Sequence, residues 1–190
     1  SSVLVSGVKS NGAASAIVSA TSGFTTTGNS GAVNISTNQL TLDNSGHIDT
    51  GSASLGDAGV IALTVRDLTV RNGAYITSSS LGGPGADGGN IRITGDTISL
   101  SGGSPLGTYT GILAIAGAYA GNAGNIDISS QALDITNGAQ ISSRTNGAGT
   151  GGTITVSAAR VTVAGRDTVN QASSRIDAST EIYPGYAAQN

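Results

Sequence analysis

The sequence predicts an all-β protein, a parallel β-helix of about six coils with three short strands in each coil. Two observations predict it: a repeat that begins with the same glycine each time, and aliphatic residues that alternate with polar ones inside each copy. The repeat is clearest in residues 124–145, GNIDISSQALDITNGAQISSRT. Recognisable copies cover almost the whole chain, so residues 1–190 are expected to form a single β-helix domain.

Five copies align from their shared glycine without a gap inside the aligned blocks. Their spacings are 28, 30, 35 and 28 residues. A repeat of this length cannot bury its apolar face alone, so neighbouring copies must stack. The copies begin at Gly31, Gly59, Gly89, Gly124 and Gly152.

The first expected strand follows the glycine directly. Aliphatic residues stand two and four positions after it, and polar residues mostly lie between them, which points one face inward and the other to water. If the copies stack in register, Ile91 and Ile126 must be neighbours in one ladder. The two columns are Val33, Ile61, Ile91, Ile126 and Ile154, then Ile35, Leu63, Ile93, Ile128 and Val156.

A second strand is expected nine to eleven residues after the glycine, with the same alternation. Aliphatic ladders are expected to fill the narrow core, since β-branched side chains pack well on a pleated surface. Val3 and Val5 have the spacing of this strand, so the chain enters in the middle of a coil. The columns are Leu40, Leu68, Ile98, Leu133 and Val161, then Leu42, Val70, Leu100, Ile135 and Val163.

A third short strand follows a turn in each copy. The turn glycine is assigned to Gly46 in one copy, and to Gly73 after Asn72 or Gly138 after Asn137 in others; these residue types suit a left-handed backbone. The apolar centre of this strand is Ile48, Ile76, Ile141 or Ile176, with either Ile112 or Ile115 in the copy that carries an insertion.

Variation in repeat length is expected in loops at one corner. Insertions span residues 101–111, with Pro105 and Tyr109, and residues 164–174. Residues 181–190, which contain Tyr183 and Tyr186, are expected to form a closing loop. At roughly 4.8 Å per coil the whole would be a rod on the order of 30 Å long.

The terminal coils carry no recognisable cap. We therefore expect them to continue into further coils, within a longer chain or through copies of the chain stacked end to end. Sedimentation of the isolated chain tests the second arrangement.

Composition excludes several classes of function. Eight basic residues stand against eleven acidic ones, so no nucleic-acid footprint is expected. No apolar run is long enough to insert into a membrane. There is no cysteine, which removes disulfides and thiolate metal sites.

The residues predict a non-catalytic protein, with no catalytic, cofactor-binding or metal-binding residue assigned. His47 is the only histidine and stands in an outward slot beside Ile48. No G-x-S-x-G sequence supports a nucleophile. Asp49 and Asp177 share an outward slot but lie in distant coils, so they form no acidic pair of the kind that glycoside hydrolysis needs.

Other motifs have plain structural interpretations. Gly83, Gly85 and Gly88 satisfy a G-x-G-x-x-G pattern, but a strand follows, so a phosphate loop is not expected. The segment GGPGAD at residues 82–87 begins like a calcium-binding nonapeptide without a tandem copy, so calcium in an acidic loop is the one cofactor left open. Asn34 opens a formal glycosylation acceptor inside an expected strand. Two charge pairs share slots in adjacent coils: Arg92 with Asp127, and Arg66 with Asp96.

The units GNAGNIDISSQALDITNGAQISSRT and GDAGVIALTVRDLTVRNGAYITSSS resemble the repeats of filamentous-haemagglutinin-type exoproteins, two-partner-secreted adhesins of Gram-negative bacteria, especially the forms common in cyanobacteria. The resemblance implies a right-handed parallel β-helix in the repeat shaft of an extracellular or cell-surface rod. It implies adhesion, aggregation or surface coating, and it assigns no binding residue. The NPNG-type motifs of that family's secretion domain are not evident in this sequence.

Two classes of function stay open at this point. The first is a structural or adhesive rod segment whose loops contact cell-surface carbohydrate or protein. The alternative is a carbohydrate-active β-helix enzyme or a carbohydrate-binding module beside the long loops. Five tyrosines could stack on sugars: Tyr75, Tyr109, Tyr119, Tyr183 and Tyr186.

Overall fold

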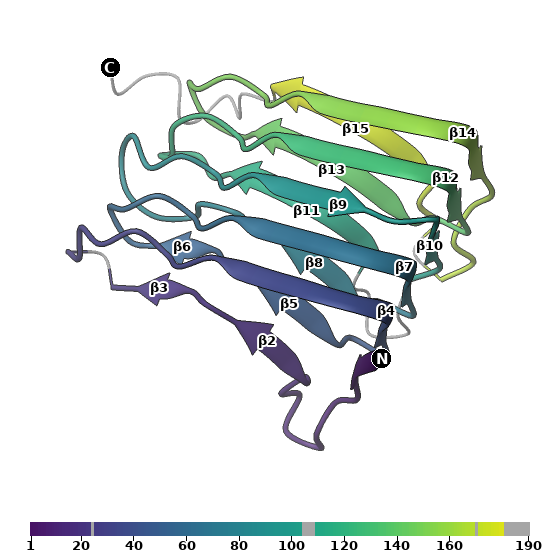
Figure 1. Cartoon of the computed structure of the whole chain (residues 1–190). Helices are drawn as coiled ribbons and strands as arrows, with labels where there is room; N and C mark the ends of the chain where they lie inside the picture. The colour runs from purple at the N-terminus through teal and green to yellow at the C-terminus, as the bar shows by residue number, and fades with distance from the viewer. Residues whose placement is uncertain (24, 104–108, 170, 181–190) are drawn as a thin grey trace.

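The structure, a computed structural model, describes residues 1–23, 25–103, 109–169 and 171–180. These residues form strands and loops, and no helix occurs among them. Figure 1 shows the strands stacked in two facing layers, with β14 and β15 at the end of the stack opposite the N-terminus. The chain is therefore all-β, as predicted, and its strands run parallel as in a β-solenoid.

Parallel pairing builds three sheets. The largest has the order β1-β4-β7-β10-β12-β14, with β9 between β7 and β12. The second has the order β15-β13-β11-β8-β5-β2, and β3 pairs with β6. The first sheet comprises β1 (Ser2–Ser6), β4 (Val33–Asp43), β7 (Ile61–Arg71), β9 (Ile91–Thr94), β10 (Thr97–Ser101), β12 (Ile126–Thr136) and β14 (Ile154–Ala164). The others comprise β2 (Ala16–Val18), β5 (His47–Asp49), β8 (Tyr75–Thr77), β11 (Gly111–Ala116), β13 (Gln140–Thr145) and β15 (Arg175–Thr180), then β3 (Thr21–Ser22) and β6 (Ser52–Ala53).

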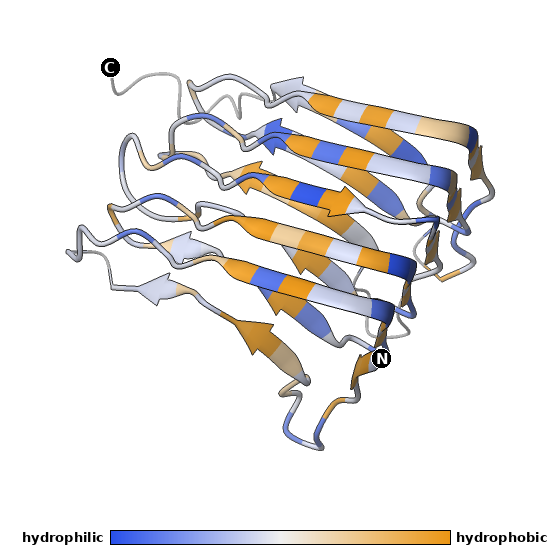
Figure 2. Ribbon diagram, viewed as in Figure 1, coloured by the Kyte–Doolittle hydropathy of each residue, from blue (hydrophilic) through white to orange (hydrophobic). Residues whose placement is uncertain are grey.

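The predicted register of the stack is confirmed. Ile126 lies beside Ile91 on one side and Ile154 on the other, and Val3 lies beside Leu40. Figure 2 shows the alternation of apolar and polar residues along these strands. The apolar residues form one continuous core cluster across the stack. In the second sheet, Ile112 rather than Ile115 occupies the inward isoleucine column. The full column is Ile17, Ile48, Ile76, Ile112, Ile141 and Ile176.

The prediction of three separate strands in each coil is wrong in one respect. The first and second segments run together as one 11-residue strand in β4, β7, β12 and β14. Only β9 and β10 are separate, interrupted at Gly95 and Asp96. The residues between the two segments carry on pairing with the next repeat, so the polar break in the sequence bends the strand without ending it.

Left-handed turns end the long strands and begin the strands of the second sheet. Asn72 and Gly73 have φ values of 55° and 77°, and Asn137 and Gly138 have 53° and 86°, as predicted. In the first copy the assignment of Gly46 is wrong. There the left-handed pair is Asn44 and Ser45, with φ values of 49° and 63°.

Replacing Ser45 by glycine is expected to stabilise the protein by about 0.5 to 1 kcal/mol. A left-handed backbone costs a side-chain-bearing residue roughly 1 to 2 kcal/mol, while the extra chain freedom of glycine offsets part of the gain. The Ser45 hydroxyl is also buried with no hydrogen-bond partner. Urea denaturation measures the change, and Ser45→Ala is the control because it removes the hydroxyl but keeps the strained backbone. A gain in Ser45→Ala equal to that in Ser45→Gly would contradict the backbone explanation.

The glycine that opens each repeat packs against the repeat before it. A Cβ atom on Gly89 would overlap the carbonyl oxygen of Gly59 and the hydroxyl of Ser78. Gly124 and Gly152 meet the carbonyl oxygen of the preceding repeat glycine in the same way. None of these glycines has a positive φ, so close approach between repeats is what requires glycine here.

Hydroxyl groups fill the interior beyond the isoleucine column of the second sheet. The Ser143 hydroxyl donates to the carbonyl oxygen of Gly124 at 2.7 Å, and the Thr50 hydroxyl donates to that of Gly59 at 3.2 Å. The expectation of a core filled by aliphatic ladders alone is wrong on this side, because short hydroxyl side chains satisfy carbonyl groups that aliphatic residues would leave unpaired. The buried residues here whose hydroxyls donate to carbonyl oxygens are Thr50, Ser52, Ser54, Ser78, Ser143 and Thr145.

Long loops emerge at one corner of the stack, as predicted. The corner lies between the two larger sheets, where β1 leads to β2, β10 to β11 and β14 to β15. Each excursion is closed by one antiparallel bridge, and the bridges join residues 8 and 14, 103 and 109, and 166 and 173. Pro105 and the expected closing loop at residues 181–190 lie outside the described residues.

Candidate functional site

A shallow groove crosses the outer face of the largest sheet. Its volume is about 200 Å³. The outward side chains of β9, β12 and β14 line it, because alternate residues of these strands point away from the core. These side chains are Arg92, Thr94, Asp127, Ser129, Thr155 and Ser157.

The predicted pair of Arg92 and Asp127 closes an ion pair across two strands in this groove. Their Nη2 and Oδ2 atoms are 3.5 Å apart, and the side chains are 73% and 43% exposed. An exposed pair of this length contributes only about 0 to 1 kcal/mol to stability. Both groups therefore keep hydrogen-bonding capacity toward a ligand.

The second predicted pair forms differently. The backbone N–H of Asp96 donates to the carbonyl oxygen of Arg66 at 2.8 Å, so the two residues are neighbours as expected. The Arg66 guanidinium instead bonds the carboxylate of Asp67 at 3.0 Å. Slot alignment placed the backbones correctly, but the side chain of Arg66 pairs with the next residue of its own strand.

His47 lies on the outer face of the second sheet, half-buried against Tyr75. The two rings stack with centroids 4.7 Å apart and an interplanar angle of 8°. Burial, then the nearby carboxylate of Asp49, raises the pKa of the Tyr75 hydroxyl. His47 and Tyr75 occupy the same position in adjacent repeats, so their contact could have been predicted from the alignment, but it was not.

The acidic residues Asp49 and Asp177 are not brought together. They occupy one outward column but belong to β5 and β15, and Thr77, Leu113 and Ser142 stand between them. Each is therefore several strands from the other.

A side-chain ladder follows the corner just before the repeat glycines. The side-chain oxygen of each residue accepts the backbone N–H of its equivalent in the next repeat. Asn29 accepts from Asp57 at 2.9 Å, Asp57 from Asp87 at 2.9 Å, Asp87 from Asn122 at 2.7 Å and Asn122 from Thr150 at 3.0 Å. These bonds tie neighbouring repeats together at a corner where β-pairing has lapsed.

The acidic loop of residues 82–87, for which calcium binding is the one cofactor interaction not excluded by the sequence, lies at this corner. A cleft of about 340 Å³ runs beside Asp57 and Asp87. The described residues hold no group of three or more histidine or acidic side chains that could bind a metal ion. Both aspartates already accept backbone hydrogen bonds.

The remaining motifs lie in ordinary structural positions. β9 follows Gly83, Gly85 and Gly88, so no helix opens after that pattern. Asn34 lies within β4. No helix long and apolar enough to cross a membrane occurs in the described part of the chain.

Of the five tyrosines considered for sugar stacking, Tyr109 and Tyr119 are exposed. The ring of Tyr75 is stacked on that of His47. Tyr183 and Tyr186 lie outside the described residues. The described tyrosines thus fall on different segments, and none of them lines the groove on β9, β12 and β14.

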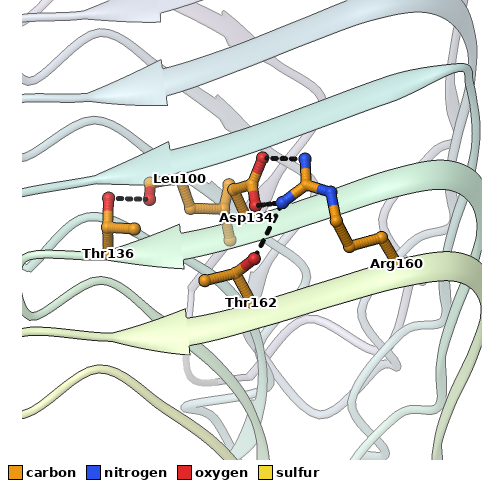
Figure 3. A network of polar contacts seen from close by, with 5 residues as sticks. All are labelled: Leu100, Asp134, Thr136, Arg160 and Thr162. Carbon is orange, nitrogen blue, oxygen red and sulfur yellow. Dashed lines mark hydrogen bonds and ion pairs between the residues drawn. The ribbon is translucent and has the colours of Figure 1, made fainter.

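Two stronger ion pairs lie on the outer face. Arg160 grips Asp134 through two hydrogen bonds of 2.7 and 3.0 Å, and its Nη1 atom also bonds Thr162 at 2.9 Å (Figure 3). Hydrogen bonding to the Asp134 carboxyl, first from Arg160 and then from Thr162, lowers its pKa. For Asp43, partial burial raises the pKa, but hydrogen bonds from Arg71 and Asn72 outweigh it and the pKa is lowered.

Acid is therefore expected to weaken the fold through Asp43 and Asp134. A carboxylate with a depressed pKa in the folded state adds stability above its unfolded-state value, near 4, and loses that contribution as the pH falls through the folded value. When the pH is lowered below about 4, the urea concentration at the unfolding midpoint should decrease. The decrease should be small, because both pairs are exposed. An Asp43→Asn, Asp134→Asn double variant should show a flatter acid slope than Asp127→Asn, and equal slopes would refute the assignment.

Comparisons with protein-family models, curated proteins and solved structures give no match to this chain. Its function must therefore be argued from its own residues.

Proposed function

We propose that the chain is a section of a rigid, right-handed β-helical rod of about six coils, with a structural or adhesive role at the surface of a Gram-negative bacterium. One observation carries the proposal: the ladders continue in register from β1 to β14 and from β2 to β15. A stack held mainly by contacts between neighbouring repeats is suited to extension in one direction. The resemblance of its repeats to filamentous-haemagglutinin-type exoproteins supports the extracellular setting.

The apolar columns become partly exposed to solvent at β14 and β15. Val161 and Val163 in β14 are 46% and 44% exposed, and Ile176 in β15 is 39% exposed, although their column neighbours Ile135 and Ile141 are fully buried. Another layer of strands laid on β14 and β15 would bury these side chains. The layer would come from more of the same polypeptide or from a second copy.

Electron microscopy tests the rod and its location together. Antibodies raised against the purified chain, followed by immunogold labelling of intact producing cells, should mark thin filaments that project from the surface. Label that appears only after the cells are permeabilised would overturn the proposal.

The groove on the outer face of β9, β12 and β14 favours a second candidate function, contact with carbohydrate without catalysis. Its polar residues place a guanidinium, a carboxylate and hydroxyl groups side by side on an exposed surface. Such groups form hydrogen bonds with sugar hydroxyls. Glycan-array binding should drop in Arg92→Ala and persist in Arg66→Ala, an exposed arginine outside the groove. Equal binding by both variants would remove this candidate.

We do not propose catalysis. The only histidine is stacked on Tyr75, and Asp49 lies far from Asp177 along the column. The described residues thus offer a recognition surface and no paired acid and base.

A further inference from the structure

We propose that Asn11 is a site of spontaneous covalent modification, deamidation by water through a cyclic imide, and that the fold protects the other Asn-Gly pairs of the chain. Four asparagines precede a glycine: Asn11, Asn72, Asn137 and Asn146. In sequence they are equivalent, because glycine has no Cβ to hinder ring closure in any of them. Their structural settings differ.

The reaction begins at the backbone nitrogen of the glycine. That nitrogen loses its proton to base and attacks the asparagine Cγ, forming an N–Cγ bond, and the Cγ–Nδ2 bond breaks to release ammonia. Water then opens the ring at either carbonyl, giving aspartate or isoaspartate. Ring closure needs an N–H that base can reach, a side chain that other repeats do not hold, and a backbone that can rotate the nitrogen toward Cγ.

Asn72 lacks all three conditions. Its φ is 55°, and its Nδ2 donates to the Asp43 carboxylate at 2.8 Å. The N–H of Gly73 donates at 2.9 Å to the hydroxyl of Thr110, which is fully buried. The reactive nitrogen is therefore shielded from base, and the side chain that it must reach is held by another strand.

Asn137 has the same protection two repeats further along the stack. Its φ is 53°, and its Nδ2 donates to the Ser101 hydroxyl at 3.2 Å. The N–H of Gly138 donates to the Ser174 hydroxyl at 2.9 Å. Ring closure at either turn requires the local stack to open first, and each 1.4 kcal/mol of opening free energy slows the reaction about tenfold.

Asn146 is held by its neighbours along the stack. Its N–H donates to the carbonyl oxygen of Ala116 at 2.9 Å, and Gly147 is buried against the carbonyl of Ala118. Rotation of this peptide unit would break contacts between repeats. We place its rate between those of Asn11 and the two turn asparagines.

Asn11 stands at the tip of the exposed hairpin of residues 8–14. Nothing lies within 4 Å of the position of a Cβ on Gly12. The N–H of Gly12 makes only a local turn bond, to the carbonyl of Lys9 at 2.9 Å. The Oδ1 atom of Asn11 accepts the N–H of Ala13 at 3.2 Å, which polarises the amide carbonyl for attack. This turn can open without breaking a sheet.

Peptide mapping of the whole chain after incubation in mildly alkaline buffer tests the proposal. In the native protein, deamidation at Asn11 should be at least about tenfold faster than at Asn72 or Asn137. In concentrated urea the four sites should react at similar rates. Native rates at Asn72 or Asn137 that match Asn11 would overturn it, as would a rate at Asn11 that urea accelerates as much as theirs.

Matched variants identify the modified residue. Asn11→Gln should abolish the new acidic species seen on isoelectric focusing, and Asn72→Gln should leave it in place. The modified protein should melt at the temperature of the unmodified one, because the hairpin between β1 and β2 extends away from the stack (Figure 1). Persistence of the acidic species in Asn11→Gln would refute the site.

Discussion

Replacing Ile128 by aspartate is expected to abolish cooperative folding. Ile128 is 2% exposed and lies in β12 between Ile93 and Val156 of the neighbouring strands. A carboxylate at this position would be buried with no partner, at a cost of several kcal/mol out of a typical total of about 5 to 15 kcal/mol. Circular dichroism during thermal and urea denaturation measures the loss.

The adjacent residue provides the control. Asp127 points outward, and Asp127→Ser removes only an exposed ion pair with Arg92. The free energy of unfolding should therefore change by only about 0 to 1 kcal/mol. Equal melts for the two variants would mean that the inward and outward faces have been exchanged.

Replacing Gly124 by alanine is expected to destabilise the protein by about 3 kcal/mol or more, although the change adds a single methyl group. A Cβ on residue 124 would overlap the backbone of Gly89. The two glycines cannot easily move apart, because the strands that follow them, β9 and β12, are paired with each other. The repeats would have to separate locally. Urea denaturation with an unchanged m-value would report the loss.

Gly28→Ala is the matched control for this substitution. Gly28 is exposed, has an ordinary φ, and has nothing within 4 Å of its Cβ position. Alanine there should be neutral or stabilise by up to about 1 kcal/mol, since it restricts the unfolded chain. If Gly124→Ala were as well tolerated as Gly28→Ala, close approach would not explain the glycine column.

The order of the stack could be predicted because its signals are local or strictly periodic. Alternation places Ile126 and Ile128 on the inward face, and the shared glycine places Ile91 beside Ile126. The left-handed turn at Asn72 and Gly73 followed from residue type alone. A shift by one residue would expose the whole aliphatic column, so the pattern fixes the register strongly.

The candidate site was only partly predictable. The pair of Arg92 and Asp127 followed from slot alignment, but the groove around it depends on how three strands lie side by side. The stacking of His47 on Tyr75 was visible in the same alignment, once adjacent repeats are read as direct neighbours.

The sequence by itself determined the strand positions, the inward columns and the turns, since each depends on residue type and spacing along one segment. Only the tertiary structure decided what depends on the repeat above or below. It joined the first and second segments of β12 into one bent strand, and it made the opening glycines obligatory by setting Gly89 against Gly59. It also lined one side of the interior with hydroxyls such as Ser143, whose acceptor is the carbonyl oxygen of Gly124. The physical reason is distance along the chain: the contacting groups are 19 to 35 residues apart, and no local pattern records how closely their backbones approach.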